Sequence, residues 1–253
     1  MAAQVTVEII AHRGASFDAP ENTLAAVKLG WEQNADAVEI DVQASSDHRI
    51  VVIHDDNTKK TASIDRKVCD QAFERLCELD VGRWKSPKWK GERIPTLDAV
   101  LDTVPDGKRL FIEIKCERHG LPDLAQSIQR SRCKPGQVVL IGFCLATMSE
   151  AKTLLPQLEV ARVVKCKRNW KTGRWTPTIT KLVEEAKAAG IDGLDLGANR
   201  PLTRANVEEI KAAGLNVYIW TVDSPAKARQ LMNAGVDGIT TNRPGWLREQ
   251  LQL

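Results

Sequence analysis

The chain has 253 residues, of which 43% are hydrophobic and 27% are charged, and its formal net charge is +3. This composition is typical of a globular protein and excludes a disordered chain. The small net charge gives no support to nucleic-acid binding, and we expect none. A chain of this length can form one large α/β barrel or two smaller domains.

The first residues contain no basic region followed by an apolar core, so they do not resemble a signal peptide. No apolar run approaches the length of a membrane span, and we expect no stable membrane insertion. The six cysteines form no CxxC pair. Without an export signal, they are expected to be reduced thiols of a cytoplasmic protein.

The first predicted elements are a strand, a helix and a second strand. Residues 5–11 are β-branched and apolar, which predicts a strand that ends at His12. A turn at residues 19–23 can cap the helix expected at residues 23–33. Residues 37–42 form the next predicted strand.

The strand at residues 37–42 alternates apolar residues with Glu39 and Asp41. Side chains two positions apart on a strand point the same way, so the two carboxylates face one side. Two ionised carboxylates repel each other unless a cation lies between them, and a hard divalent cation would fit. Taken alone, the pattern is equally typical of a strand with one face in water.

An irregular stretch follows this strand. Residues 50–53 predict a short strand that ends at His54, and from residue 57 to residue 93 the regular pattern is lost. One short helix is expected within this stretch, at residues 69–79. Regular structure resumes with a helix at residues 95–101, which has proline at its start.

The remainder alternates strands and helices. We expect strands at residues 110–114, 138–142, 160–164, 193–196, 217–220 and 238–241. The helices between them include residues 121–130, 178–189, 203–213 and 225–234. Gly190, Gly214 and Gly235 each end a predicted helix just before a strand, as in a repeated βα unit. With the first two strands the count is eight, which predicts a closed (β/α)8 TIM barrel.

The alternative architecture is a doubly wound open sheet. Such a fold places a glycine-rich, dinucleotide-binding turn after its first strand. The residues after the first predicted strand, His12-Arg13-Gly14, do not form such a turn. The closed barrel is therefore the preferred prediction.

In a TIM barrel the reactive groups gather where the strands end. The polar and aromatic residues at these predicted positions are His12, Arg13, Glu39, Asp41, His54, Glu113, Lys115 and Trp220. Each has an ordinary structural explanation, but together they are hard to explain by coincidence. Three carboxylates favour Mg²⁺ or Ca²⁺, two cationic side chains suit a phosphate, and two histidines suit acid and base roles. The set indicates hydrolysis of a phosphate ester.

These residues lie in motifs that resemble those of the glycerophosphodiester phosphodiesterase family. The motifs keep the family's order over nearly the whole chain and are His12-Arg13-Gly14, Pro20-Glu21-Asn22-Thr23, Glu39-Ile40-Asp41-Val42, His54-Asp55, Leu79-Asp80-Val81-Gly82, Gly91-Glu92-Arg93-Ile94-Pro95-Thr96-Leu97, Glu113-Ile114-Lys115, Trp220-Thr221-Val222 and Asp237-Gly238-Ile239. Each motif alone is weak, whereas the combination is highly specific.

The resemblance implies a single domain over residues 1–253 that folds as a TIM barrel. A small insertion after the second βα unit is implied at about residues 55–93. The usual family activity releases glycerol 3-phosphate and an alcohol, such as choline or ethanolamine, from a deacylated phospholipid. The implied roles are ligation of one Mg²⁺ or Ca²⁺ ion by Glu39, Asp41 and Glu113, acid–base catalysis by His12 and His54, phosphate binding by Arg13 and Lys115, and a place near the glycerol for Trp220.

The sequence departs from the family pattern at two places. Asn242 stands where the family often has aspartate, and Asn57 or Thr58 stands where it often has leucine. We expect neither departure to touch the metal or acid–base residues. Glu21 is expected either to support the first histidine or the metal, or to serve only in the turn that caps the helix.

A basic segment with two tryptophans, residues 165–175, follows the fifth predicted strand. Such a segment can contact nucleic acid or a lipid surface. We favour a loop at the rim of the pocket that helps to select the alcohol, and a solvated loop with packed tryptophans is the plain alternative.

Three rival functions remain open at this point. An enzyme of the same superfamily could act on lysophospholipids or sphingomyelin, which would require an apolar entrance to the active site. A barrel could bind a phosphorylated ligand without catalysis, but it would have no use for two histidines and a metal. A barrel isomerase or aldolase usually depends on a catalytic lysine or a late phosphate site, and no glycine-rich phosphate turn stands out late in the chain.

Overall fold

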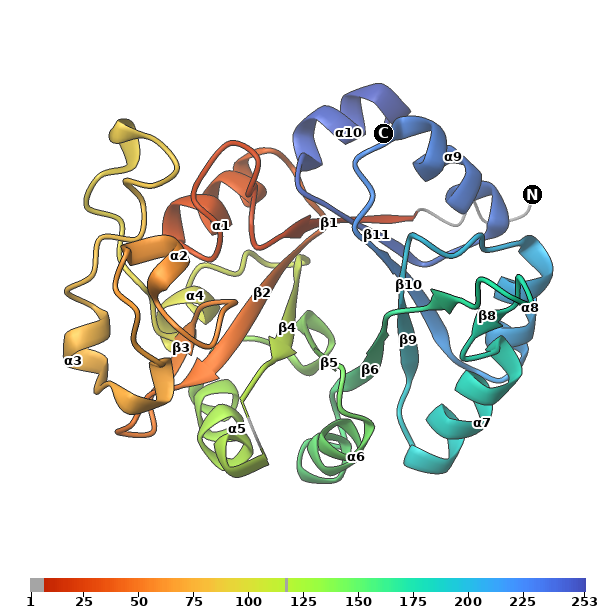
Figure 1. The fold of residues 1–253 in the computed structure, drawn as a ribbon, viewed down its shortest axis with the longest axis horizontal. Helices are drawn as coiled ribbons and strands as arrows, with labels where there is room; N and C mark the ends of the chain where they lie inside the picture. Colours follow the sequence, from red (N-terminus) through yellow and green to blue (C-terminus); the bar gives the residue numbers. More distant parts are fainter. Residues whose placement is uncertain (1–6, 117) are drawn as a thin grey trace.

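The computed structural model describes residues 7–116 and 118–253 and contains a closed barrel of eight parallel strands (Figure 1). The barrel strands are β1 Glu8–His12, β2 Ala37–Ala44, β4 Arg109–Ile114, β5 Val138–Gly142, β6 Glu159–Val164, β9 Gly193–Gly197, β10 Asn216–Trp220 and β11 Gly238–Thr241. The first strand pairs with both β2 and β11, which closes the sheet on itself. This closure confirms the predicted TIM barrel and excludes the open sheet. The first residues of the strand predicted at 5–11 lie outside the described residues.

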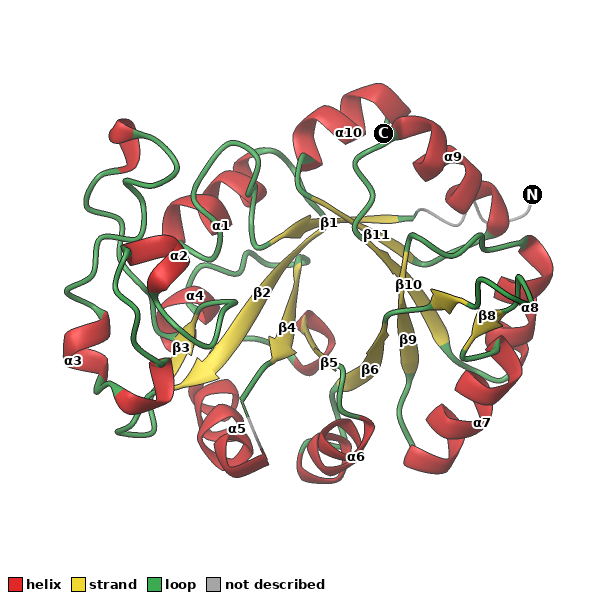
Figure 2. Cartoon of the chain, viewed as in Figure 1, coloured by secondary structure: helices red, strands yellow, loops and turns green. Residues whose placement is uncertain are grey.

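Helices surround the barrel on its outer side (Figure 2). One helix follows each barrel strand along the chain, and the eight are α1 Leu24–Glu32, α4 Leu97–Leu101, α5 Leu121–Arg130, α6 Leu145–Leu154, α7 Ile179–Ala189, α8 Arg204–Ala212, α9 Pro225–Ala234 and α10 Pro244–Leu251. In the described part of the chain, no helix has both the length and the apolar character that a membrane crossing requires.

Local sequence signals account for the ends of these helices. Thr23, Thr178 and Thr203 each accept a hydrogen bond from a backbone N–H in the first turn of the following helix. Gly190 and Gly235 end their helices in the left-handed conformation that glycine adopts without strain. Gly214, with φ +79°, lies one residue beyond Ala213, the C-cap of α8. The repeated glycine pattern of the sequence therefore marks helix ends, as predicted.

Side chains that point into the barrel form layers along its axis. The middle of the barrel is apolar and includes Ile10, Phe111 and Tyr218, whose two aromatic rings meet edge to face with centroids 5.0 Å apart. The N-terminal end of the barrel is closed by Arg109, whose guanidinium bonds to Glu8 and to other acceptors. The opposite end, where the strands finish, is therefore the open one.

The insertion begins beside the barrel. A short strand, β3 Ile50–Val52, pairs antiparallel with β2, and the following residues form α2 Lys59–Ala62, a 3-10 turn at Val68–Asp70, α3 Phe73–Leu76 and a 3-10 turn at Pro87–Trp89. A separate small core, with Val68 and Leu76 fully buried, holds this segment together.

The single helix predicted at residues 69–79 is wrong, because the segment forms two short pieces. Gln71 between them is extended, with φ −124° and ψ 133°. Its carbonyl oxygen accepts a hydrogen bond from the Ser46 backbone N–H at 2.9 Å. The side chain of Asp47 accepts another from the Phe73 N–H at 2.9 Å. These tertiary bonds interrupt the helix where the local pattern would continue it.

The basic segment at residues 165–175 is a hairpin rather than an open loop. Its two short strands, β7 Lys167–Arg168 and β8 Trp175–Thr176, pair antiparallel. The hairpin leaves the end of β6, at the C-terminal end of the barrel strands. Trp170, near its tip, is 86% exposed, so this tryptophan is not a packed one.

Candidate active site

Three carboxylates meet at the open end of the barrel. Parallel register places Asp41 on β2 directly beside Glu113 on β4, and Glu39 lies two residues before Asp41 on the same face. Each of the three offers a carboxylate oxygen, and these oxygens lie within 4.8 Å of one another. The side chains are almost fully buried, with 3%, 1% and 8% of Glu39, Asp41 and Glu113 exposed.

The electrostatics of this cluster are unfavourable without a cation. Burial and the nearby Asp41 raise the pKa of Glu39 to about 8 and that of Glu113 to about 7. Burial also opposes ionisation of Asp41, but Lys115 and Arg13 outweigh it and hold the pKa of Asp41 below its usual value. The cluster thus keeps Asp41 ionised, while Glu39 and Glu113 hold their protons to a higher pH than ordinary carboxyl groups do.

The donor set fits a hard divalent cation. All three groups are carboxylates, which Mg²⁺ and Ca²⁺ prefer. Oxygens on opposite sides of such an ion lie about 4–5 Å apart, twice the usual metal–oxygen distance. The observed spread of the carboxylate oxygens agrees with that size.

A tight turn after β1 positions the first histidine and the first arginine. Arg13 and Gly14 both have positive φ, +55° and +77°. A Cβ on Gly14 would lie 2.4 Å from the carbonyl carbon of Ala26 in α1, so only glycine fits there. The turn directs the Arg13 backbone N–H to Glu39 Oε2 at 2.9 Å. The His12–Gly14 motif therefore also fixes one of the carboxylates.

The Arg13 side chain is held between two acids. Its Nε lies 3.1 Å from Asp41 Oδ2, and its Nη1 donates to Glu21 Oε1 at 2.9 Å. Lys60 from the insertion also binds Glu21, with Nζ 2.8 Å from Oε1. Glu21 therefore holds Arg13 in place. The sequence analysis expected it to support the first histidine or the metal, or to serve only in the turn, and neither role included Arg13.

Asn22 binds the central carboxylate, a contact that sequence reasoning missed. Its Nδ2 donates to Asp41 Oδ2 at 2.9 Å, and its Oδ1 accepts from the Asp41 backbone N–H at 3.1 Å. Asn22 has φ +60°, a conformation that asparagine tolerates better than most residues. The only signal in the sequence for this contact was an asparagine within a motif of turn residues.

His12 is oriented by Asn242. Its Nδ1 lies 2.7 Å from Asn242 Oδ1, which also accepts a hydrogen bond from Ser16 at 3.0 Å. The Asn242 amide nitrogen donates to Asp223 Oδ2 at 2.7 Å, which fixes the orientation of the amide. His12 Nδ1 is therefore the donor, and Nε2 is left with a free lone pair. Burial, reinforced by the charge of Arg13, lowers the pKa of His12.

The prediction that the Asn242 departure lies away from the acid–base residues is wrong. Asn242 directly follows β11, and β11 pairs with β1, which carries His12. The closure of the barrel brings these two ends together, although they are 230 residues apart in the chain. No local pattern in the sequence contains that contact.

His54 reaches the site from β3, outside the barrel proper. Its Nδ1 lies 2.6 Å from Asp55 Oδ1, so a carboxylate rather than an amide orients this imidazole. Burial lowers the pKa of His54, while Asp41 and Asp55 oppose that shift. The two histidines therefore differ in partner, one neutral and one anionic.

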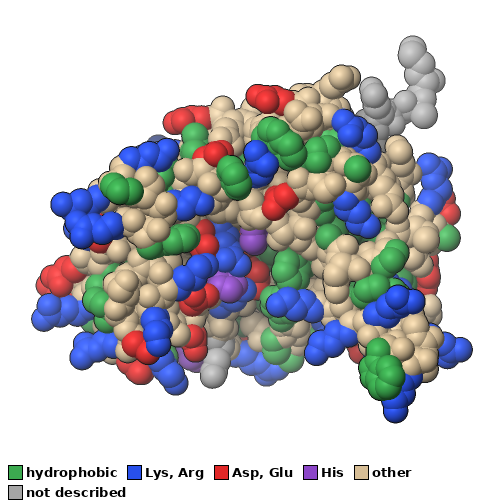
Figure 3. Space-filling view, turned by 45° about the horizontal axis from the view of Figure 1, so that its top comes forward, with side chains coloured by type: hydrophobic (Ala, Val, Ile, Leu, Met, Phe, Trp, Pro, Cys, Tyr) green, Lys and Arg blue, Asp and Glu red, His purple; other side chains and the backbone are tan. Residues whose placement is uncertain are grey.

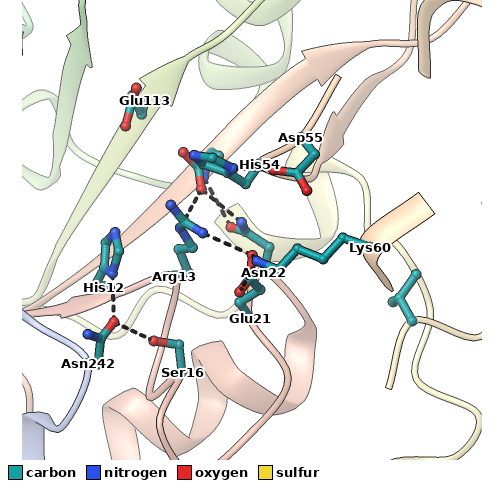
Figure 4. A network of polar contacts seen from close by, with 12 residues as sticks. His12, Arg13, Ser16, Glu21, Asn22, His54, Asp55, Lys60, Glu113 and Asn242 are labelled. Atoms are coloured by element: carbon teal, nitrogen blue, oxygen red, sulfur yellow. Dashed lines mark hydrogen bonds and ion pairs between the residues drawn. The ribbon is translucent and has the colours of Figure 1, made fainter. Parts of the chain in front are cut away.

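Lys115 lies beside the carboxylates. Its Nζ is 2.6 Å from Glu113 Oε1 and 3.1 Å from Asp41 Oδ1. Figure 4 shows His12, Arg13, His54 and Glu113 around one common space, with Asn22 and Glu21 next to Arg13.

Comparison with known proteins agrees with this geometry. The profile of the glycerophosphoryl diester phosphodiesterase family matches residues 12–246. The chain belongs to this family. A glycerophosphodiester phosphodiesterase of Caldanaerobacter subterraneus is 32% identical over 240 residues, covering 93% of this chain and 94% of that one. The Bacillus subtilis protein YhdW, provisionally named for the same activity, is 34% identical over 242 residues, covering 94% and 96%.

A solved structure is also similar to this phosphodiesterase. An Oleispira antarctica phosphodiesterase, in complex with the product sn-glycerol-3-phosphate, is 26% identical and superimposes with a TM-score of 0.86. The match covers 97% of each chain. The family, the enzyme class and the fold of the chain are thus the ones that the sequence motifs implied.

Trp220 lies at the same end of the phosphodiesterase barrel. Its indole Nε1 donates to the Asp195 carbonyl oxygen at 3.2 Å, and its ring meets that of Phe143 edge to face, with centroids 5.8 Å apart. Phe143, directly after β5, was not among the predicted site residues. A single phenylalanine after an apolar strand gives no sign that it will face the site.

Asp195 is a further carboxyl group buried inside the barrel of the phosphodiesterase. It lies on β9, is 3% exposed, and its Oδ1 has no hydrogen-bond partner among the described residues. Burial raises its pKa well above the ordinary value, and Glu113 and Glu39 add to the shift. The alternation of Asp195 with Leu194 and Leu196 repeats the pattern of the carboxylate strand and could have identified it.

The surface of the phosphodiesterase is hollowed at this end. Figure 3 shows histidine side chains in a recess, with lysine and arginine side chains around it and acidic ones beside them. The arrangement brings together carboxylates for a cation, cationic groups for an anion, and two imidazoles for proton transfer.

Proposed function

We propose that the phosphodiesterase hydrolyses glycerophosphodiesters to glycerol 3-phosphate and an alcohol by metal-assisted acid–base catalysis. The observation that supports this most strongly is the meeting of three buried carboxylates with Arg13, Lys115 and two differently oriented histidines. Glycerophosphocholine and glycerophosphoethanolamine are the reference substrates. The proposed catalytic unit is the single domain 1–253, with residues 55–93 as its insertion, and a cytoplasmic location stays a prediction.

Glu39, Asp41 and Glu113 would hold one Mg²⁺ or Ca²⁺ ion. The raised pKa values of Glu39 and Glu113 support this proposal, because a cation would supply the positive charge that the buried carboxylates lack. When bound, a divalent cation polarises phosphate oxygens and stabilises the charge that develops on them.

Arg13 and Lys115 would bind the remaining phosphate oxygens. Burial lowers the pKa of both side chains, but the neighbouring carboxylates outweigh it and keep both cations protonated. Glu21 holds the Arg13 guanidinium from behind, which limits its freedom before substrate arrives. A fixed guanidinium stabilises a phosphate more effectively than a mobile one.

The two histidines are proposed to divide the proton transfers. His12 has a neutral amide on Nδ1 and a lowered pKa, so its Nε2 suits the removal of a proton from the attacking oxygen. Burial lowers the pKa of His54 as well, but the Asp55 carboxylate on its Nδ1 opposes that shift, so His54 is the better placed of the two to carry a proton to the departing alkoxide. The attacking oxygen is water or the glycerol 2-hydroxyl, and the latter would give a cyclic phosphate intermediate.

Trp220 would contact the organic part of the substrate next to the phosphate. Its ring is half-buried at the end of β10, above the apolar middle of the barrel. Its assignment to the glycerol side is a prediction from the resemblance, and the groove proposed below would instead place the alcohol against this ring.

The test is release of glycerol 3-phosphate from both reference substrates, with chelator present and with each divalent ion added back. His12→Ala and His54→Ala are expected to lose at least about a hundredfold in kcat, the usual worth of positioned proton transfer. His48→Asn is the matched control, because His48 is exposed and has the positive φ that asparagine tolerates. Turnover by either histidine variant at the control's rate would refute the proposed acid–base pair.

A further inference from the structure

A groove leads outward from the site between the ends of β6, β9 and β10. Its volume is about 460 Å³, and Trp220, Asn199, Lys165 and Lys167 are among the residues that line it. A glycerol moiety has three carbons, whereas pockets of about 300–1,000 Å³ hold much larger groups. The groove is therefore large enough for the alcohol part of a diester.

The groove connects to the carboxylate cluster through a short series of contacts. Lys115, which pairs with Asp41 and Glu113, has its Nζ 5.5 Å from the Phe143 ring centroid. Phe143 in turn packs against Trp220, which forms part of the groove wall. An alcohol attached to a phosphate at the cluster can extend along this path.

The charged residues that line the groove are all cationic. Lys165 and Lys167 contribute the charge, and none of the described residues that line it is an aspartate or a glutamate. The nearby Asp195 side chain lies inside the barrel and is expected to be protonated because its pKa is raised. The electrostatic potential of the groove is therefore expected to be positive.

The aromatic pair beside the groove, Trp220 and Phe143, already lies close to the ammonium of a lysine. Trp220 and Phe143 could bind a quaternary ammonium over their ring faces. The Lys165 Nζ, however, lies 5.7 Å from the centroid of each ring. A choline group in this place would meet the Lys165 ammonium, which carries the same charge, and like charges placed together disfavour binding of a ligand.

We propose that this groove binds the alcohol and selects diesters whose alcohol carries a further negative charge, such as a phosphate. Lys165 is the specificity-determining residue, since its ammonium faces the groove and both rings. The inference rests on the proposed phosphodiesterase function and adds the class of substrate. A neutral alcohol is expected to rank between an anionic one and choline.

The test compares kcat/KM at low ionic strength for three diesters. They are glycerophosphoglycerol, the same compound with a phosphate on its distal hydroxyl, and glycerophosphocholine. At an effective dielectric constant near that of a wet surface, one charge at this distance changes affinity by about threefold to tenfold. We expect each step of the ranking to have that size and to shrink as salt is added.

Substitutions separate the role of Lys165 from general charge effects. Lys165→Met is expected to bring the three kcat/KM values closer together, and Lys165→Glu to place choline above the anionic alcohol. Lys171→Met is the matched control, because Lys171 lies on the same hairpin against the exposed Trp170 ring and does not line the groove. The control is expected to keep the wild-type ranking.

Two results would overturn the inference: choline preferred or equal in the wild type, or a ranking that Lys165→Glu leaves unchanged. Calorimetric binding of the three diesters to His12→Ala tests the ranking without turnover. If no diester is hydrolysed under any metal condition, the proposed function fails, and the binding ranking still decides on the groove. If all are hydrolysed at equal kcat/KM, only the groove inference fails.

Discussion

His12 Nδ1 lies 2.7 Å from the side-chain oxygen of Asn242, although the two residues are 230 positions apart. The contact exists because β1 and β11 are the strands that close the barrel. It places a neutral group where a carboxylate would stabilise a protonated ring. The acid–base chemistry of His12 is therefore tuned by the last barrel strand.

Replacing this amide by a carboxylate should change the pH dependence of the enzyme. Asn242→Asp places a negative charge against His12 and raises the pKa of the imidazole. A base must be unprotonated to act, so the acid limb of the kcat/KM profile should move upward by about one pH unit. Ser16→Ala removes a neighbouring hydrogen bond without a charge and should leave the limb in place. An unmoved limb in Asn242→Asp would show that His12 is not the base.

Metal binding should release protons. In the absence of a cation, the pKa of Glu39 is about 8 and that of Glu113 is about 7, so both carboxyls hold protons at lower pH. A cation must displace these protons, and its affinity should rise by up to about tenfold per pH unit for each proton until pH 8. Calorimetry in two buffers of different ionisation enthalpy measures the released protons. Equal affinity at pH 6 and pH 8 would contradict this expectation.

Asn22 should stabilise the fold through Asp41. Asn22→Asp removes the Nδ2 donor and puts a second carboxylate against Asp41, and the expected loss in the free energy of unfolding is about 1–3 kcal/mol. Asn22→Gly also loses the bond but relieves the positive φ of residue 22. Urea denaturation in chelator should therefore show a larger loss for aspartate than for glycine. The reverse order would mean that backbone strain dominates at this position.

Asp195 should reduce stability as the pH rises. Because its folded-state pKa is raised, the native state holds a proton that the unfolded chain releases above about pH 4. The free energy of unfolding then falls with increasing pH until the folded-state pKa is reached. Asp195→Asn removes this loss, so in chelator it should raise the melting temperature more at pH 8 than at pH 5. An equal effect at both pH values would contradict the buried, protonated carboxyl.

Much of the fold could be predicted from the hydrophobic periodicity of the sequence and from the residues that end helices. The barrel strands are apolar runs buried on both sides, and glycine marks the ends of helices such as α7 and α9. The alternation at Glu39 and Asp41 is local and was visible in the sequence. The break in the helix at Gln71 was not visible there, because it is caused by a tertiary hydrogen bond from the Ser46 N–H to the Gln71 carbonyl oxygen.

The supporting residues of the site were harder to predict. Asn22, Asp55 and Asn242 act by binding a site residue brought to them by a turn or by barrel closure. Their side chains are common in turns. The sequence alone therefore does not distinguish a residue that orients a site side chain from one that only caps a helix or turn. Phe143 faces the site only because of the position of β5 in the barrel.

The central claim is that one cation and two histidines act at a shared site in separate roles. Calorimetric titration of chelator-treated protein with Mg²⁺ and Ca²⁺, run beside the assay for glycerol 3-phosphate, tests it most directly. We predict one binding site per chain, metal affinity lost in Glu39→Ala, and affinity kept but turnover lost in His12→Ala and His54→Ala. Full turnover in chelator, or metal binding undiminished by Glu39→Ala, would contradict it.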